Sequence, residues 1–173
     1  MELRTRIATV ALSAAAVVGI TACDPAPPTV EQVVKPAPTA AKPAASLDAM
    51  SQQVVDLTNS ERAKAGLGPV AVDSALVAAA QGHSNDQAAR NTMTHTGTNG
   101  SSAMARMQAA GFNGSIFGEN VAYGYRTADT VMNGWMNSSG HRANILNGRF
   151  TKIGVAIATG GNGSLYWTMD LGG

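Results

Sequence analysis

The chain has a single cysteine among its 173 residues, at position 23. A disulfide needs two cysteines, so none can form within one copy of the chain, and an ordinary hydrophobic core has to stabilise the fold. A lone cysteine is either a free buried thiol or a residue with a chemical role. The apolar segment that directly precedes Cys23 favours a chemical role.

An excess of charge of one sign is also absent. Residues 47–173 contain eight basic and eight acidic side chains. This balance argues against a nucleic-acid partner, because proteins that bind nucleic acids carry a basic surface. The same region has no apolar run of 18 residues, so the sequence predicts no membrane-spanning helix there.

The sequence lacks the short signatures of well-known catalytic classes. It contains no His-Glu-x-x-His, no Gly-x-Ser-x-Gly, no Walker loop and no Rossmann fingerprint. No serine is paired with a histidine by such a motif, so nucleophilic catalysis has no support. Whether the protein is an enzyme is left open by the sequence.

The N-terminal segment is predicted to be an export signal. Two arginines precede an apolar stretch of 14 residues, 7–20, which is too short to span a bilayer as a helix. The residues that follow, Ile-Thr-Ala-Cys at 20–23, resemble the lipobox of bacterial lipoproteins. This resemblance implies that residues 1–23 are a lipoprotein signal peptide, that Cys23 is lipidated, and that the protein is anchored outside the cytoplasm.

A tether and one domain make up the rest of the chain. Residues 24–46 contain six of the seven prolines and show no apolar periodicity, which indicates a semi-extended linker. Residues 47–173 are numerous enough for one globular domain with its own core.

Within this domain the hydrophobic periodicity predicts an α+β fold. Two period-two stretches, 153–158 and 165–171, flank a glycine-rich turn and predict a β-hairpin. Helical spacing and capping residues predict helices, and the expected elements in chain order are a helix from 47 to about 65, a helix from Asp73 to about Arg90, a short helix after Ser101 or Ser102, a strand at 117–125, a helix from Thr127 to near Asn137 and one more turn at 142–146. Helices on both faces of a small, mostly antiparallel sheet are the economical arrangement.

Three side chains from separate segments are candidates for a shared site. His95 and His141 lie in polar surroundings that contain glycine, and Glu119 follows a glycine in the predicted strand. Two imidazoles and one carboxylate can bind a divalent metal ion, such as zinc, or transfer protons. His83 differs, because it lies on the apolar face of the second helix and is interpreted as a packed, hydrogen-bonded residue.

Four segments in order resemble a known family. They read HSNDQAARNTMTHTG, GENVAYG, VMNGWMNSSGHRANILNGRFTKIGVAIA and YWTMDLG, and they are similar to the bacterial branch of the CAP superfamily, named for cysteine-rich secretory proteins, antigen 5 and pathogenesis-related 1 proteins. The resemblance covers nearly all of residues 47–173. It implies a three-layer α-β-α sandwich whose central cleft is lined by His95, Glu119 and His141.

The chain departs from the eukaryotic pattern of this family at two points. A second glutamate is expected shortly after the tryptophan of the helix, but Trp135 is followed by Met136, Asn137 and Ser138. The cysteines of the eukaryotic members are also missing. A mechanism that requires paired carboxylates is therefore in doubt for this chain.

The leading hypothesis is a membrane-anchored CAP-domain lipoprotein whose cleft binds a small ligand or a divalent metal ion. His95 and His141 would be the metal ligands, and Glu119 is either the third ligand or a hydrogen-bonding partner of an imidazole. Asn120 and Asn144 would fit a cluster that bridges backbone groups. The expected partners are the membrane, through the lipid on Cys23, and a small-molecule, lipid or cell-wall ligand.

Two alternatives from other functional classes remain. One is a hydrolase that acts on a peptide or cell-wall substrate, with Glu119 or a histidine as general base. The other is a non-catalytic interaction module, in which the same residues form a structural cluster.

Overall fold

The computed structural model describes residues 47–173. The predicted signal peptide at 1–23, the proposed lipid attachment site Cys23 and the predicted tether at 24–46 lie outside these described residues. Within 47–173, no helix combines the length and the apolar character needed to cross a membrane.

All of the described helices except the last begin where a side chain accepts a hydrogen bond from a free amide group of the first turn. The Asp73 carboxylate accepts from the amides of Ala75 and Leu76 at the start of the second helix, as the sequence predicts. Asn91, in the left-handed conformation with φ 49°, ends this helix and turns the chain into the loop that carries His95. The helices are α1 (Ala49–Lys64), α2 (Ser74–Arg90), α3 (Ala103–Ala109), α4 (Ala128–Met136) and α5 (Ser139–Ile145).

The described strands form one sheet in the order β1-β3-β4-β2. β3 pairs antiparallel with β4, β4 pairs antiparallel with β2, and β1 pairs parallel with β3. The predicted hairpin and the mostly antiparallel sheet are confirmed, whereas the sequence analysis missed β1, which is too short for an alternating pattern. The strands are β1 (Ala71–Val72), β2 (Phe117–Tyr123), β3 (Lys152–Thr159) and β4 (Leu165–Gly172).

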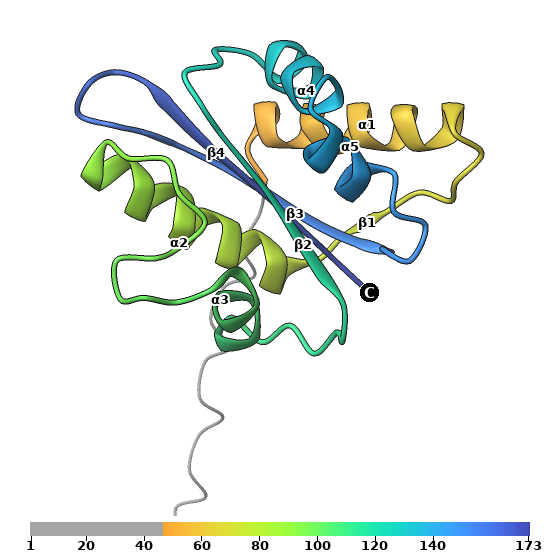
Figure 1. The fold of residues 1–173 in the computed structure, drawn as a ribbon, viewed down its shortest axis with the longest axis horizontal. Coiled ribbons are helices and arrows are strands. Elements are labelled where there is room, and N and C mark those ends of the chain that lie inside the picture. Colours follow the sequence, from red (N-terminus) through yellow and green to blue (C-terminus); the bar gives the residue numbers. More distant parts are fainter. Residues whose placement is uncertain (1–46) are drawn as a thin grey trace, which may run out of the picture. The chain divides into compact units, whose positions relative to one another are not determined.

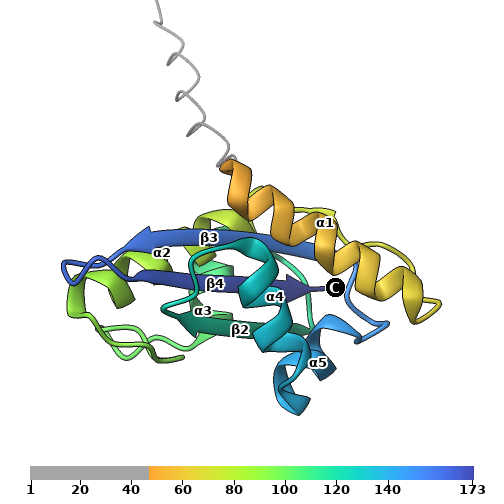
Figure 2. The ribbon, with the colours of Figure 1, turned by 90° about the horizontal axis from the view of Figure 1, so that it is seen from above.

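The elements stack in three layers (Figures 1 and 2). Helices α2 and α3 lie on one face of the sheet, and α1, α4 and α5 lie on the other. β4 is central and buried on both faces, so its two sets of alternating side chains both enter the interior. Trp167 packs with Trp135 in the larger apolar core, whereas Thr168 bonds to Ser84 and Gln87 of α2. The predicted α-β-α sandwich is therefore confirmed.

A glycine permits the close approach of α2 to the sheet. A Cβ atom at Gly154 of β3 would collide with the backbone of Leu76 and Val77 in α2. Helix α2 therefore lies directly against the strand at this point, and this contact sets the distance between α2 and the neighbouring strands. The face of β2 and β4 that carries the polar residues described below lies on this side of the sheet.

A buried arginine holds the opposite layer together. Arg62 of α1 is 1% exposed, and its guanidinium donates to the carbonyl oxygens of Gly68, Ile145, Asn147 and Phe150. These bonds connect α1 to the end of α5 and to the segment that leads into β3. The position of α5, which carries His141, is fixed in part by this arginine.

Candidate functional site

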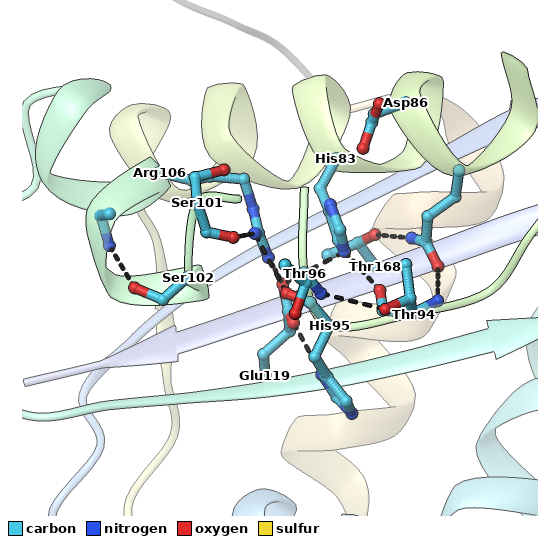
Figure 3. Close-up of polar contacts among 12 residues, drawn as sticks. His83, Asp86, Thr94, His95, Thr96, Ser101, Ser102, Arg106, Glu119 and Thr168 are labelled. Carbon is cyan, nitrogen blue, oxygen red and sulfur yellow. Dashed lines mark hydrogen bonds and ion pairs between the residues drawn. The ribbon is translucent and has the colours of Figure 1, made fainter. Parts of the chain in front are cut away.

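Glu119 of β2 is the centre of the candidate site. Its side chain is 3% exposed, and both carboxylate oxygens have a partner. Oε1 accepts from Nδ1 of His95 at 2.7 Å, and Oε2 accepts from Nη2 of Arg106 at 2.5 Å. Figure 3 shows the two side chains converging on this carboxylate from different segments of the chain. A buried negative charge is thereby matched by one positive charge and one further donor.

His95 is held by its ring and by its backbone. Nη1 of Arg106 donates to the carbonyl oxygen of His95 at 3.1 Å, while Nδ1 of the ring donates to Glu119. The His95 side chain remains 60% exposed. Because a carboxylate can only accept, the proton lies on Nδ1, and the neutral ring carries its lone pair on Nε2.

His141 lies beside this pair, near the start of α5, and is half-buried. Its carbonyl oxygen accepts from the side-chain amide of Asn120, the residue that follows Glu119. Asn144 donates to the carbonyl oxygen of Glu119 and to the side chain of Asn120. The two asparagines thus bridge β2 and α5, as the sequence analysis suggested.

The partly buried position of His141 affects the pKa of its imidazole. Burial lowers the pKa of the His141 imidazole below its ordinary value, and the positive charge of a protonated His95 lowers that pKa further. His95 is therefore near enough to influence His141 electrostatically. At neutral pH the lowered pKa keeps His141 in the neutral form.

His83 lies behind Glu119 and is completely buried. Nε2 donates to the carbonyl oxygen of Thr94 at 2.7 Å and is 3.9 Å from Oε2 of Glu119. Burial lowers the pKa of the His83 imidazole, so the ring is neutral at neutral pH. The interpretation of His83 as a packed, hydrogen-bonded residue is confirmed.

A second carboxyl group, that of Asp170, completes the buried polar cluster. Asp170 of β4 is the direct cross-strand partner of Glu119 and is 0% exposed. Neither of its oxygens has a hydrogen-bond donor among the residues that the structure describes. Burial, and then the negative charge of Glu119, raise the pKa of the Asp170 carboxyl well above its ordinary value.

A hollow of about 350 Å³ borders the cluster on the α2 side. His83 and Arg106 form part of its wall, together with residues of the loop that connects α2 to α3. Both side chains also approach Glu119, so the same two residues contact the hollow and the central carboxylate.

The part of the chain that the structure describes has no preformed metal site with three or more ligands. No group of at least three His, Cys, Asp or Glu side chains within 47–173 is arranged to hold a metal ion. The residues that could hold one are the two exposed or half-exposed imidazoles, His95 and His141. Both oxygens of Glu119 already accept hydrogen bonds, one from His95 and one from Arg106.

Sequence reasoning missed Arg106 and Asp170. Arg106 is the only lysine or arginine between Arg90 and Arg126 and lies in the predicted short helix that precedes the strand of Glu119, and this was the signal that could have identified it. Asp170 gave a weaker signal, a carboxylate in an alternating strand. Its meaning depends on the pairing of β2 with β4, which the sequence does not give.

Comparisons with known proteins agree with this fold. Residues 55–171 match the model of the cysteine-rich secretory protein family, CAP. The uncharacterized protein YkwD of Bacillus subtilis (strain 168) is 39% identical over 125 residues, which are 72% of this chain and 48% of YkwD. The uncharacterized membrane protein YlbC of the same strain is 35% identical over 106 residues, 61% of this chain and 31% of YlbC.

A solved structure is similar as well. The crystal structure of an extracellular protein containing an SCP domain from Bacillus anthracis str. Ames superposes with a TM-score of 0.65 at 31% identity, over 70% of this chain and 39% of that one. The chain belongs to the CAP family. It spans less than half the length of each of these three relatives.

Proposed function

We propose that this chain is a CAP-domain lipoprotein of the cell envelope that binds a divalent metal ion, such as zinc, through His95 and His141. The observation that carries the proposal is the 2.7 Å bond from Nδ1 of His95 to Glu119. It leaves Nε2 of the neutral ring with a lone pair on a side chain that is 60% exposed. Metal-binding histidines commonly have this arrangement, with the second ring nitrogen bonded to a carboxylate.

His141 is suited to be the second ligand because burial lowers the pKa of its imidazole. A metal ion binds the neutral ring, and a lowered pKa maintains that form at neutral pH. Two imidazoles leave the other coordination positions to water or to a small ligand. We therefore expect weak metal binding and an open coordination sphere.

Calorimetric titration of the full-length protein with zinc tests this proposal. The wild-type protein should bind one equivalent, and the His95→Ala/His141→Ala double variant should bind none. His83→Gln is the matched control, because His83 is buried and bonded to Thr94, and this variant should bind zinc as the wild type does. Unchanged zinc binding in the double variant would refute the metal site.

We also propose that the protein is located outside the cytoplasm and attached to a membrane by a lipid on Cys23. Support comes from the lipobox-like residues 20–23 and from two relatives, one described as an extracellular protein and one as a membrane protein. Cys23→Ser should transfer the protein out of the membrane fraction and abolish incorporation of a labelled fatty acid. Equal labelling of wild type and variant would contradict the anchor.

A second candidate function is the hydrolysis of a peptide or cell-wall substrate, and the His95–Glu119 pair favours it too. A histidine whose Nδ1 is held by a carboxylate can accept a proton at Nε2 and so act as general base. Turnover of casein or peptidoglycan should then be lost in both His95→Ala and Glu119→Gln. Turnover that survives in both variants would exclude this role.

A further inference from the structure

Asp170 and Glu119 stand directly opposite each other on neighbouring strands. They are register partners in the antiparallel pair of β2 and β4, so their side chains leave the sheet on the same face with Cβ atoms about 5 Å apart. Thr168, two residues before Asp170, accepts from Ser84 and Gln87 of α2, which identifies this face as the one that α2 covers. Two carboxyl groups therefore meet between the sheet and α2.

The environment of Asp170 does not suit an anion. The residue is 0% exposed, and within 47–173 neither oxygen has a hydrogen-bond donor. A carboxylate buried without donors is strongly disfavoured, because it loses its hydration and gains nothing in exchange. A protonated carboxyl group can instead donate one hydrogen bond to a neighbouring acceptor.

The charged and titratable groups from the surrounding elements do not compensate for a second negative charge. Arg106 of α3 is bonded to Glu119, so its positive charge is matched by that carboxylate. His83 of α2 lies 3.9 Å from the same oxygen, and burial lowers the pKa of its ring, which leaves it neutral. Glu119 of β2 adds a negative charge of its own. The single positive charge of Arg106 is thus the only one available to two carboxyl groups among the residues named here.

We propose that Asp170 carries a proton at neutral pH and donates it in a hydrogen bond to Glu119, so that the two side chains form a carboxylic acid–carboxylate pair. Glu119 then accepts from three neighbours, namely Asp170, Arg106 and His95. Three donors from different elements hold the carboxylate in one orientation. Asp170 is too deeply buried to touch a ligand and is a positioning residue, which acts on His95 through Glu119.

This pair places a second carboxyl group next to Glu119, although the second glutamate of the eukaryotic family pattern is missing. The eukaryotic pattern has a second glutamate after the helix tryptophan, where this chain has Asn137 and Ser138. Asp170 lies next to Glu119 on the adjacent central strand, β4. The effect of the pair on metal binding rests on the proposed function, whereas the proton on Asp170 does not depend on it.

Infrared spectroscopy of the full-length protein at neutral pH tests the proton directly. The carbonyl stretch of a protonated carboxylic acid is separate from the bands of carboxylates, and the wild type should show one such band. Asp170→Asn should abolish it. Asp56→Asn is the matched control, because Asp56 lies exposed on α1, and the band should persist in that variant. Absence of the band from the wild type, or its persistence in Asp170→Asn, would overturn the proposal.

The same band tests whether Glu119 is the acceptor. In Glu119→Gln the neighbouring negative charge is removed and Arg106 loses its carboxylate, so Asp170 should ionise and the band should disappear or shift. A band of unchanged position and intensity in this variant would show that Glu119 does not accept the hydrogen bond from Asp170.

The positioning role is tested by the ring nitrogens of His95. Nitrogen-15 spectra should show the Nδ1-protonated ring in the wild type and in Asp170→Asn, whose amide can still donate to Glu119. Asp170→Leu has no donor and should give a mixture of ring forms. An unchanged ring in Asp170→Leu would overturn the positioning role, and Asp170→Ala, which also lacks a donor, replaces this variant if it does not fold. Failure of zinc binding alone would leave these signals in place and would refute only the metal site.

Discussion

Nδ1 of His95 lies 2.7 Å from Oε1 of Glu119, and this bond decides which nitrogen of the ring is presented to solvent. The carboxylate is in β2, inside the sandwich, and the imidazole is in the loop after α2, with 60% of its side chain exposed. A group fixed by the fold thus orients a group that can meet a ligand. The chemistry of the site follows from this relationship between an interior anion and a surface imidazole.

Removing the charge of Glu119 should weaken metal binding without touching a proposed ligand. In Glu119→Gln the amide cannot satisfy His95 and Arg106 together, because one of its two polar atoms donates where both partners need an acceptor. The zinc affinity should fall about 10- to 100-fold, as measured by calorimetry. Glu61→Gln on α1 is the control, and an affinity in Glu119→Gln equal to that of this control would contradict the orienting role.

Arg106 should contribute strongly to stability. Arg106→Met leaves the Glu119 carboxylate, 3% exposed, without its positive partner, and the free energy of unfolding should drop by about 3–5 kcal/mol. Arg90→Met removes a comparable bond to Asp86 near the surface and should change stability by about 1 kcal/mol or less. Urea denaturation measures both, and equal losses would contradict the account of a buried ion pair.

The buried His83 should make the protein sensitive to acid. Burial lowers the pKa of its ring in the folded state, so below about pH 6.5 the unfolded chain takes up a proton that the folded chain does not. The stabilising effect is thus present above about pH 6.5 and is lost as the pH falls through the folded-state pKa. His83→Gln cannot titrate but can still donate to Thr94. Its stability deficit against the wild type should shrink between about pH 7.5 and about pH 5, and a constant deficit would contradict this assignment.

The contact of α2 with the sheet should not tolerate a side chain at Gly154. A methyl group there would collide with the backbone of Leu76 and Val77, so Gly154→Ala should destabilise the fold by about 1–3 kcal/mol or more. Gly68→Ala is the control, because a Cβ atom at that position meets open space. Its unfolding free energy should stay within about 1 kcal/mol of the wild type. Similar midpoints for the two variants would show that α2 can move away from β3.

Much of the fold could be predicted from the sequence because its signals are local. Asp73 caps α2 and Thr127 caps α4, as their positions before apolar helical patterns indicate. The glycine-rich turn joins β3 to β4 and forms the β-hairpin that the sequence predicted. Each of these features depends on residues that are close together in the chain, so spacing and capping rules describe them well.

The rest depends on contacts between distant segments. β1 consists of two residues and is recognisable by its pairing with β3. The meeting of Asp170 with Glu119 follows from the placement of β2 beside β4, which no local pattern encodes. The family resemblance identified His95, Glu119 and His141. It did not indicate that Glu119 accepts a hydrogen bond from Arg106, because that bond depends on the packing of α3 against β2.

Imidazole nitrogen-15 spectra recorded during a zinc titration test whether His95 and His141 bind one metal ion together. The Nε2 signal of His95 and one ring-nitrogen signal of His141 should shift together and saturate at one equivalent of zinc. His83, bonded to Thr94 in the interior, should keep its signals and serves as the internal reference. A titration in which the signals of neither His95 nor His141 respond to zinc would contradict a metal ion shared by the two rings. So would a His141→Ala variant in which the His95 signal shifts with zinc as it does in the wild type.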